Sequence, residues 1–144
     1  MKHIGNTFEY ERERDEDLLR AYREAIAQVA FIDLDEICRK IVKMPAKRYW
    51  ISPKRASIII SAIEHGKGVG HLRPNGQRRA MDIYSRYKVL RQQFPEQPLL
   101  CLAEKVVFGP APEFYLTPES AKIILHRIRK KRYEECKRRL RHTL

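Results

Sequence analysis

The sequence predicts an all-α fold: two tandem tri-helical modules related by an internal duplication, followed by a basic C-terminal helix. The first observation is a segment that occurs twice with similar residues: PAKRYWISPKRASIIISAI at 45–63 and PAPEFYLTPESAKIILHRI at 110–128. The second is that the apolar residues of both copies recur at i, i+3, i+4 and i+7, the spacing of one helix face. A gapless repeat at a fixed offset is the usual signature of a duplicated structural unit.

The repeat extends upstream of these two segments and sets the predicted boundaries of the two modules. At an offset of 65 residues it matches prolines, an aromatic couplet and aliphatic residues: Pro53 with Pro118, Tyr49–Trp50 with Phe114–Tyr115, and Ile59 with Ile124. The same offset matches residues further upstream: Asp17 with Asp82, Tyr22 with Tyr87, and Leu34 with Leu99. We therefore expect an N-terminal arm at 1–16, module 1 at 17–65, a Gly-rich basic linker at 66–80, module 2 at 81–128 and a basic helix or tail at 129–144.

The first two helices of each module follow from helical periodicity and from end signals. The first helix is predicted at 17–28 and at 82–94, and the second at 34–44 and at 99–108. Asp33 is the expected N-cap of the second helix in module 1, with Glu36 three residues later. In module 2, Gly109 is expected to end the helix in the left-handed conformation, and Pro110 cannot extend it.

The third helix of each module begins at a Ser-Pro or Thr-Pro pair. Ser52 and Thr117 are expected to cap free backbone amides, while Pro53 and Pro118 fit the first helical position. The predicted core faces correspond: Ala56, Ile59, Ile60 and Ile63 in module 1, and Ala121, Ile124, Leu125 and Ile128 in module 2. No Gly or Pro follows Pro118, so this helix should continue into the C-terminal tail.

Charge is the strongest functional clue in the composition. The 144 residues carry a formal net charge of +12, and residues 66–144 hold 18 Lys/Arg against 7 Asp/Glu. This asymmetry favours a polyanionic partner, most commonly nucleic acid, with an anionic lipid surface as the rival. The basic tail lacks a wide apolar face, and no stretch is apolar enough to span a membrane. We therefore expect nucleic acid rather than membrane.

The residue patterns of enzymes and metal sites are missing from the sequence. The five His residues show no metal-ligand spacing, and the three Cys residues form no CxxC pair. GKGVG at 66–70 lacks the spacing of a phosphate-binding loop, and the mixed charges at 9–17 are typical of a solvated helix entry. We expect no enzyme activity, cofactor or metal. We also expect buried thiols at Cys38 and Cys101, no signal peptide, and a reducing, cytoplasmic location.

The plan of each module resembles a helix-turn-helix. A second helix, a connector and a capped third helix follow one another at 34–63 and again at 99–128. This order is similar to that of small tandem helix-turn-helix DNA-binding proteins of bacteria, phages and mobile elements. The resemblance implies a third helix that enters the major groove. The connector from Met44 to Ser52 departs from the pattern, since it has about eight residues where the usual motif has three or four. The couplet Tyr49–Trp50 in it is expected to pack in the core, with base stacking as the alternative.

The candidate nucleic-acid-binding residues are basic or polar side chains on the third helices, in the linker and in the tail. Module 1 and the linker supply Lys54, Arg55, Ser57, Ser61, Lys67, Arg73, Arg78 and Arg79. Module 2 and the tail supply Lys122, His126, Arg127, Arg129, Lys130, Lys131, Arg132, Lys137, Arg138, Arg139 and Arg141. Lys54, Arg55 and Ser57 follow the helix cap, where a recognition helix touches base edges. The alternative is that these residues form ordinary solvated faces.

Together these features favour a non-enzymatic protein that binds duplex DNA. Its expected role is that of a regulator, or of an accessory or recognition subunit of a phage or mobile-element machine. Two linked modules would act as a built-in pseudo-dimer, because linkage makes the second DNA contact intramolecular. The alternative is a helical protein-interaction adaptor whose basic tail binds RNA or an acidic partner. A protein partner or self-association is compatible with both.

Overall fold

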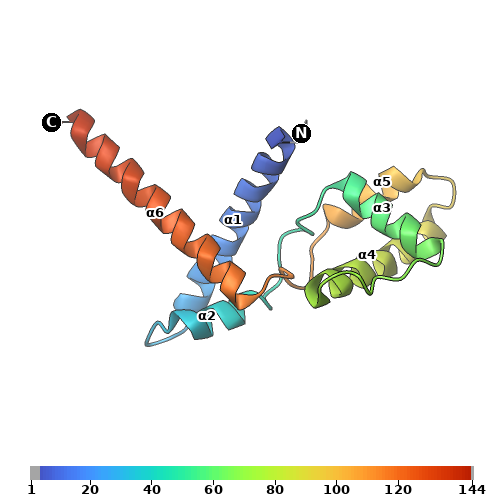
Figure 1. The fold of residues 1–144 in the computed structure, drawn as a ribbon, viewed down its shortest axis with the longest axis horizontal. Coiled ribbons are helices and arrows are strands. Elements are labelled where there is room, and N and C mark those ends of the chain that lie inside the picture. Colours follow the sequence, from blue (N-terminus) through green and yellow to red (C-terminus); the bar gives the residue numbers. More distant parts are fainter. Residues whose placement is uncertain (1–3, 144) are drawn as a thin grey trace.

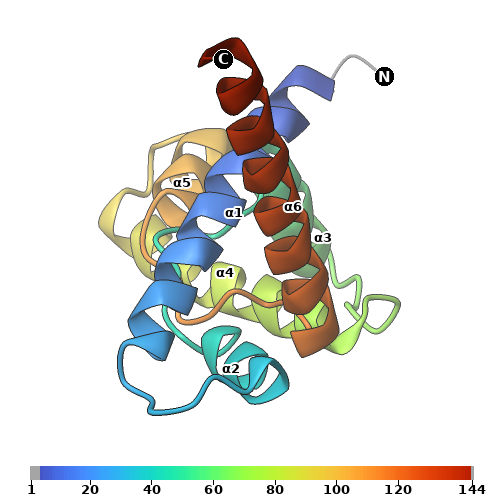
Figure 2. The same cartoon turned by 90° about the vertical axis from the view of Figure 1, so that its left-hand side faces the viewer.

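The computed structural model describes residues 4–143, which form six α-helices (Figures 1 and 2). The helices are α1 (Ile4–Ile26), α2 (Leu34–Ile41), α3 (Pro53–Glu64), α4 (Pro74–Gln93), α5 (Leu99–Val107) and α6 (Pro118–Thr143). The predicted all-α class is confirmed. Within 4–143 the backbone forms no strand, and its β-type pairing is an isolated bridge between Ala46 and Ala111.

The helices pack as two groups of three, and the grouping does not follow chain order. α6 packs against α1 and α2, whereas α3 packs against α4 and α5. Figure 1 shows α1, α2 and α6 on the left and the other three helices on the right. Each predicted third helix therefore lies on the first two helices of the other half of the chain. The modules expected at 17–65 and 81–128 are continuous in sequence, whereas the groups in space are not.

The path of the two connectors, 42–52 and 108–117, produces this grouping. They pass each other between the two groups instead of turning back (Figure 1). Three backbone N–H···O hydrogen bonds join them: Ala46 to Ala111 (3.0 Å), Ala111 to Ala46 (3.1 Å) and Phe114 to Val42 (3.2 Å). A fourth, from Tyr49 to Val107 (3.0 Å), joins the first connector to the last residue of α5. Because these bonds satisfy buried backbone groups from both halves of the chain, they fix the crossing.

The aromatic couplets pack in the core at this crossing. Tyr49, Trp50, Phe114 and Tyr115 are each 8 % exposed or less, which confirms core packing and leaves the rings too covered to stack on bases. The rings of Tyr49 and Tyr115 stack with their centroids 6.0 Å apart. Tyr115 has a φ of 57°, a left-handed conformation that an aromatic residue adopts at a cost on the order of 1 kcal/mol. The crossing is therefore tightly packed and locally strained.

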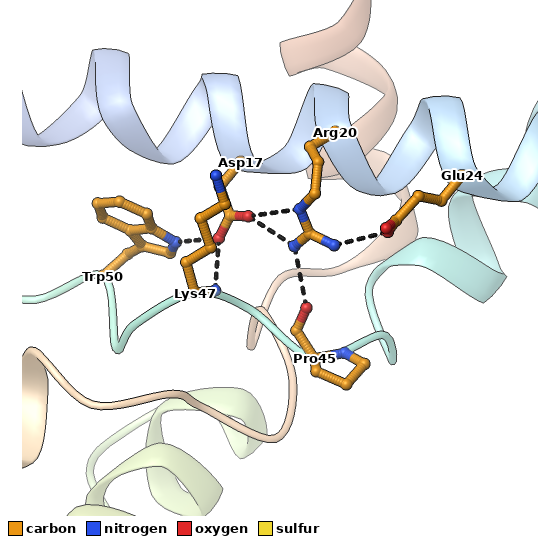
Figure 3. A network of polar contacts seen from close by, with 6 residues as sticks. All are labelled: Asp17, Arg20, Glu24, Pro45, Lys47 and Trp50. Carbon is orange, nitrogen blue, oxygen red and sulfur yellow. Dashed lines mark hydrogen bonds and ion pairs between the residues drawn. The ribbon is translucent and has the colours of Figure 1, made fainter.

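A buried aspartate fastens α1 to the first connector. Asp17 is 2 % exposed, and its carboxylate accepts four hydrogen bonds (Figure 3): from Arg20 Nε at 3.0 Å, Arg20 Nη2 at 2.6 Å, the Lys47 backbone N–H at 2.8 Å and Trp50 Nε1 at 3.0 Å. Arg20 also donates to Glu24 at 2.6 Å and to the Pro45 carbonyl at 3.1 Å. A charged carboxylate this deep is tolerated because each oxygen has donors.

The helix starts and core faces predicted for the third helices are confirmed. Ser52 Oγ accepts from the Arg55 amide and Thr117 Oγ1 from the Ser120 amide, both at 3.1 Å, and Asp33 caps α2. Along the two core faces, Ala56, Ile60, Ala121, Ile124 and Leu125 are buried, and Ile59, Ile63 and Ile128 are half-buried. α6 continues to Thr143, as the absence of Gly and Pro predicts.

Two helices begin earlier than the sequence pattern indicates. α1 starts at Ile4 rather than Asp17 and takes in most of the predicted arm, of which residues 1–3 lie outside the described part. The residues at 9–16 are mostly Glu and Arg, which are good helix formers even without an apolar stripe. α4 starts at Pro74, inside the predicted linker. Pro74 marks this start as Pro53 marks that of α3, because the first helical position needs no N–H.

Gly109 does not adopt the left-handed conformation expected of it. Within 4–143 the glycine with positive φ is Gly66, at 80°, and it ends α3. The N–H groups of Gly66 and Lys67 donate to the carbonyls of Ile63 and Ala62 at 3.0 and 2.9 Å, a Schellman arrangement. The left-handed helix end thus occurs after α3, and α5 ends before Pro110 without it.

Candidate nucleic-acid interface

The outer half of α6, residues 129–143, extends beyond its helix group. Ile128 is the last residue of α6 that packs on the core, and residues 129–142 are all exposed. Figure 1 shows this segment projecting away from its helix group and diverging from the N-terminal half of α1. Its basic residues are Arg129, Lys130, Lys131, Arg132, Lys137, Arg138, Arg139 and Arg141, against Glu134 and Glu135. Because these side chains are exposed, they present positive charge around the helix.

A cleft of about 480 Å³ lies between this segment and α1. Glu11 and Asp15 line it from α1, and Lys131 and Arg132 line it from α6. Arg127 Nη2 donates to Asp15 Oδ2 at 2.6 Å, which ties the two helices together. Arg127 is therefore already paired with a carboxylate of α1.

The first turn of α3 presents Lys54 and Arg55 to solvent. The neighbouring Ser57 hydroxyl donates to the Lys54 carbonyl at 2.7 Å, so it is engaged within its own helix. Lys54 and Arg55 share a groove of about 720 Å³ with Arg79, which comes from α4. Sequence reasoning names all three residues but assigns Arg79 to a linker, so it does not bring them together.

Ser61, Lys67 and Arg73 occupy the far end of α3 and the loop after it. Ser61 and Lys67 line a groove of about 610 Å³. Ser61 Oγ lies 3.4 Å from His65 Nδ1, and this nitrogen lies 2.7 Å from the Ser61 carbonyl oxygen. Lys67 and Arg73 are exposed, and Arg73 is the N-cap residue of α4. These side chains fit a solvated connector that can touch phosphates.

Two further candidate cations are bound to carboxylates of other elements. Arg78 Nη2 lies 2.6 Å from Glu113 Oε1, and Lys122 Nζ lies 2.8 Å from Asp35 Oδ1. Lys122 lowers the pKa of the Asp35 carboxyl through its hydrogen bond and its charge. These pairs hold α4 to the second connector and α6 to α2, so both cations have a structural partner. His126 is exposed on α6.

Two arginines at the crossing are missed by sequence reasoning. Arg48 lies over three rings, with distances from its Cζ to the ring centroids of 4.2 Å for Phe108, 5.1 Å for Trp50 and 5.9 Å for Tyr10. Burial lowers the pKa of its guanidinium. Arg86 lies 5.4 Å from the Tyr49 ring and donates to the Pro110 carbonyl at 2.6 Å. Both guanidinium groups are used for packing, and no helical periodicity marks them.

The described residues hold no cluster that would carry metal chemistry. Within 4–143, no three His, Cys, Asp or Glu side chains gather as a metal site, and no helix there is long and apolar enough to cross a membrane. Cys38 is buried, and burial raises the pKa of its thiol. Cys101 is exposed, contrary to expectation, because the buried face of α5 runs through its neighbours Leu102 and Ala103.

Comparison with known proteins adds no relative. No protein-family model matches the chain, and neither a curated protein nor a solved structure matches it significantly. The functional argument therefore rests on this chain's own residues. They define an all-helical protein with a projecting basic helix and a separate basic groove at the start of α3.

Proposed function

We propose that the protein binds duplex DNA without catalytic activity and that the outer half of α6 is its principal contact. The observation that carries the proposal is the exposure of residues 129–142, which hold eight Lys and Arg. An α-helix is about 10–12 Å in diameter and fits the major groove of B-DNA, which is about 12 Å wide. Lys and Arg at this density displace counterions from phosphates, which favours binding to duplexes of any sequence.

The length of this segment also suits a duplex. At about 1.5 Å per residue the outer half of α6 is about 22 Å long, which corresponds to about six nucleotides along one strand. Its cations point to several sides, so the strands on both flanks of a groove are within reach. Lys54 and Arg55 at the first turn of α3 add a second contact, suited to base edges or phosphates.

The finer architecture is part of the same proposal: an internal duplication whose third helices are exchanged. The hydrogen bonds at the crossing support it, because Tyr49 to Val107 and Phe114 to Val42 are related by the 65-residue offset of the repeat. Two such units form a pseudo-two-fold molecule, as dimeric helix-turn-helix proteins do with two chains. The corresponding role is that of a cytoplasmic regulator, or of a recognition subunit of a phage or mobile-element machine.

Fluorescence anisotropy with labelled duplex DNA at two salt concentrations tests the proposal. Affinity should fall steeply with salt, and removal of residues 130–144 should weaken binding to all duplexes alike. The slope of log affinity against log salt should become shallower by about 0.9 for each phosphate that the truncated protein no longer neutralises. Residues 130–142 of the deleted segment are exposed and do not pack on the core, so the truncated protein should remain folded.

A matched control removes exposed positive charge elsewhere. Arg39→Gln with Lys40→Gln lies on the exposed side of α2 and should leave the slope unchanged. An unchanged slope in the truncated protein contradicts the role given to α6. Tighter binding to RNA than to duplex DNA in the same assay would favour the alternative, an adaptor whose basic tail binds RNA.

A further inference from the structure

A second basic surface lies in the groove at the first turn of α3. The groove has a volume of about 720 Å³ and is formed by α1, the first connector, α3, α4 and α5. Tyr10 and Trp50 line it together with Lys54, Arg55 and Arg79. Three cations and two aromatic rings from four segments of the chain therefore meet in one concave site.

Arg79 has an unusual environment for an arginine. Its Nε is buried and has no hydrogen-bond partner among the described residues. Burial lowers the pKa of its guanidinium, and the titratable groups that act on it are Tyr10, Arg55 and Tyr115, none of which is a carboxylate. Arg20, by contrast, has two carboxylate partners. The charge of Arg79 is largely removed from water, and no anion among the described side chains balances it.

A guanidinium in this position destabilises the fold unless an anion joins it. Groups held at such a cost are found preferentially where they act on a ligand. The groove contains one carboxylate, Glu104, which forms no ion pair with any of the three cations within the described residues. Among the described side chains no anion balances Arg79, so the groove is suited to an anion from outside the chain.

We propose that this groove binds a phosphate group, held by Arg79 and Arg55 at the start of α3. A guanidinium presents parallel N–H donors to two phosphate oxygens, and the positive end of the α3 dipole adds to the attraction. The identification of this group with a backbone phosphate of DNA rests on the function proposed above. In that setting the groove fixes the register of α3 on the duplex, while α6 supplies affinity that is independent of sequence.

The single tryptophan of the chain makes the site measurable, because Trp50 lines the groove. Titration of the full-length protein with inorganic pyrophosphate, at constant ionic strength maintained with chloride, should give a saturable change in Trp50 fluorescence. Arg79→Met should weaken this binding by about tenfold to a hundredfold, the value of one charge-assisted contact. Arg39→Met removes one exposed cation of α2 outside the groove and should leave the affinity unchanged.

Arg79→Met should fold, because it removes a largely buried charge that has no carboxylate partner among the described residues. Its melting temperature should equal or exceed that of the parent. Arg55→Gln, at an exposed position, provides a second variant and should also weaken pyrophosphate binding. A linear, non-saturable signal, or equal losses in Arg79→Met and Arg39→Met, overturns the phosphate site.

Duplex binding by the same variants separates this inference from the proposed function. A loss of duplex affinity in Arg79→Met but not in Arg39→Met supports a backbone phosphate in the groove. Unchanged duplex affinity, with pyrophosphate binding abolished, overturns the DNA assignment and identifies a site for a free phosphate compound. Pyrophosphate binding by a protein that binds no duplex supports the phosphate site and refutes the DNA-binding function.

Discussion

We predict that Asp17→Ala destabilises the protein by about 3–5 kcal/mol, the usual cost of breaking a buried ion pair by removing one partner. The substitution leaves Trp50 Nε1, a buried donor, and the part-buried Lys47 N–H without an acceptor. Each unsatisfied donor of this kind costs about 1–3 kcal/mol. Arg20 retains Glu24 and the Pro45 carbonyl, so its own loss is smaller. Against a typical stability of about 5–15 kcal/mol for a domain, the change is large.

Asp82 provides an internal control, since it stands at the repeat offset from Asp17. Its carboxylate accepts one hydrogen bond, from the Tyr115 hydroxyl. The backbone donor that Lys47 supplies to Asp17 has no counterpart, because Pro112 occupies the equivalent position and carries no N–H. Asp82→Ala should therefore cost about 1.5–3 kcal/mol, the value of a single hydrogen bond to a charged group, which is less than the cost of Asp17→Ala.

Urea unfolding followed by far-UV circular dichroism measures both variants. This readout avoids Trp50, whose fluorescence Asp17→Ala changes directly. The expected result is an unfolding midpoint for Asp17→Ala well below that of Asp82→Ala, with equal slopes. If Asp82→Ala proved as costly as Asp17→Ala, the number of hydrogen bonds could not be the basis of the difference, and the account of this network would be wrong.

Three further predictions concern the core, the pH dependence and the exchange of helices. Ile60→Ala, at a fully buried site, should cost about 2–5 kcal/mol in chemical denaturation, whereas Ile58→Ala, at a site 54 % exposed, should cost about 0.5 kcal/mol or less. Burial raises the pKa of Tyr10 to about 12, so the fold favours its neutral form and stability should fall as pH rises from about 10 to about 12. Tyr10→Phe should flatten that fall in unfolding curves measured across the interval. A chain cut at an engineered protease site within 66–73 should elute as one species in native gel filtration and separate in denaturant; separation without denaturant would refute the exchange.

Sequence patterns predict where the helices of this protein form better than they predict which helices pack together. The caps at Asp33, Ser52 and Thr117 act locally, and so does the apolar spacing that buries Ile60 and Ile124. These signals state which face of a helix leaves water. They do not indicate which helices cover that face. The core faces of α3 and α6 are built from the same residue types, so each one fits both α1 with α2 and α4 with α5.

The candidate interface is predictable to the same extent. The basic tail is visible in the sequence because its charges are consecutive, and its exposure follows from the absence of an apolar face beyond Ile128. The groove at the first turn of α3 cannot be recognised in the sequence. Tyr10 and Arg79 belong to segments with no recognisable link to α3, and they meet Arg55 only through the packing of helices distant in sequence. Ion pairs such as Arg127 with Asp15 are equally non-local, so the pairing of these cations could not be predicted.

The long connectors join these observations. A turn of three or four residues returns a helix onto the one before it, as in the usual helix-turn-helix. Extended chain covers about 3.3 Å per residue, so the segment 42–52 is long enough to carry α3 past the crossing and onto α4 and α5. Had α3 folded back onto α1 and α2, Arg55 and Arg79 would lie in different helix groups and the groove would not form. The feature that departs from the helix-turn-helix pattern is therefore the one that assembles the candidate phosphate site.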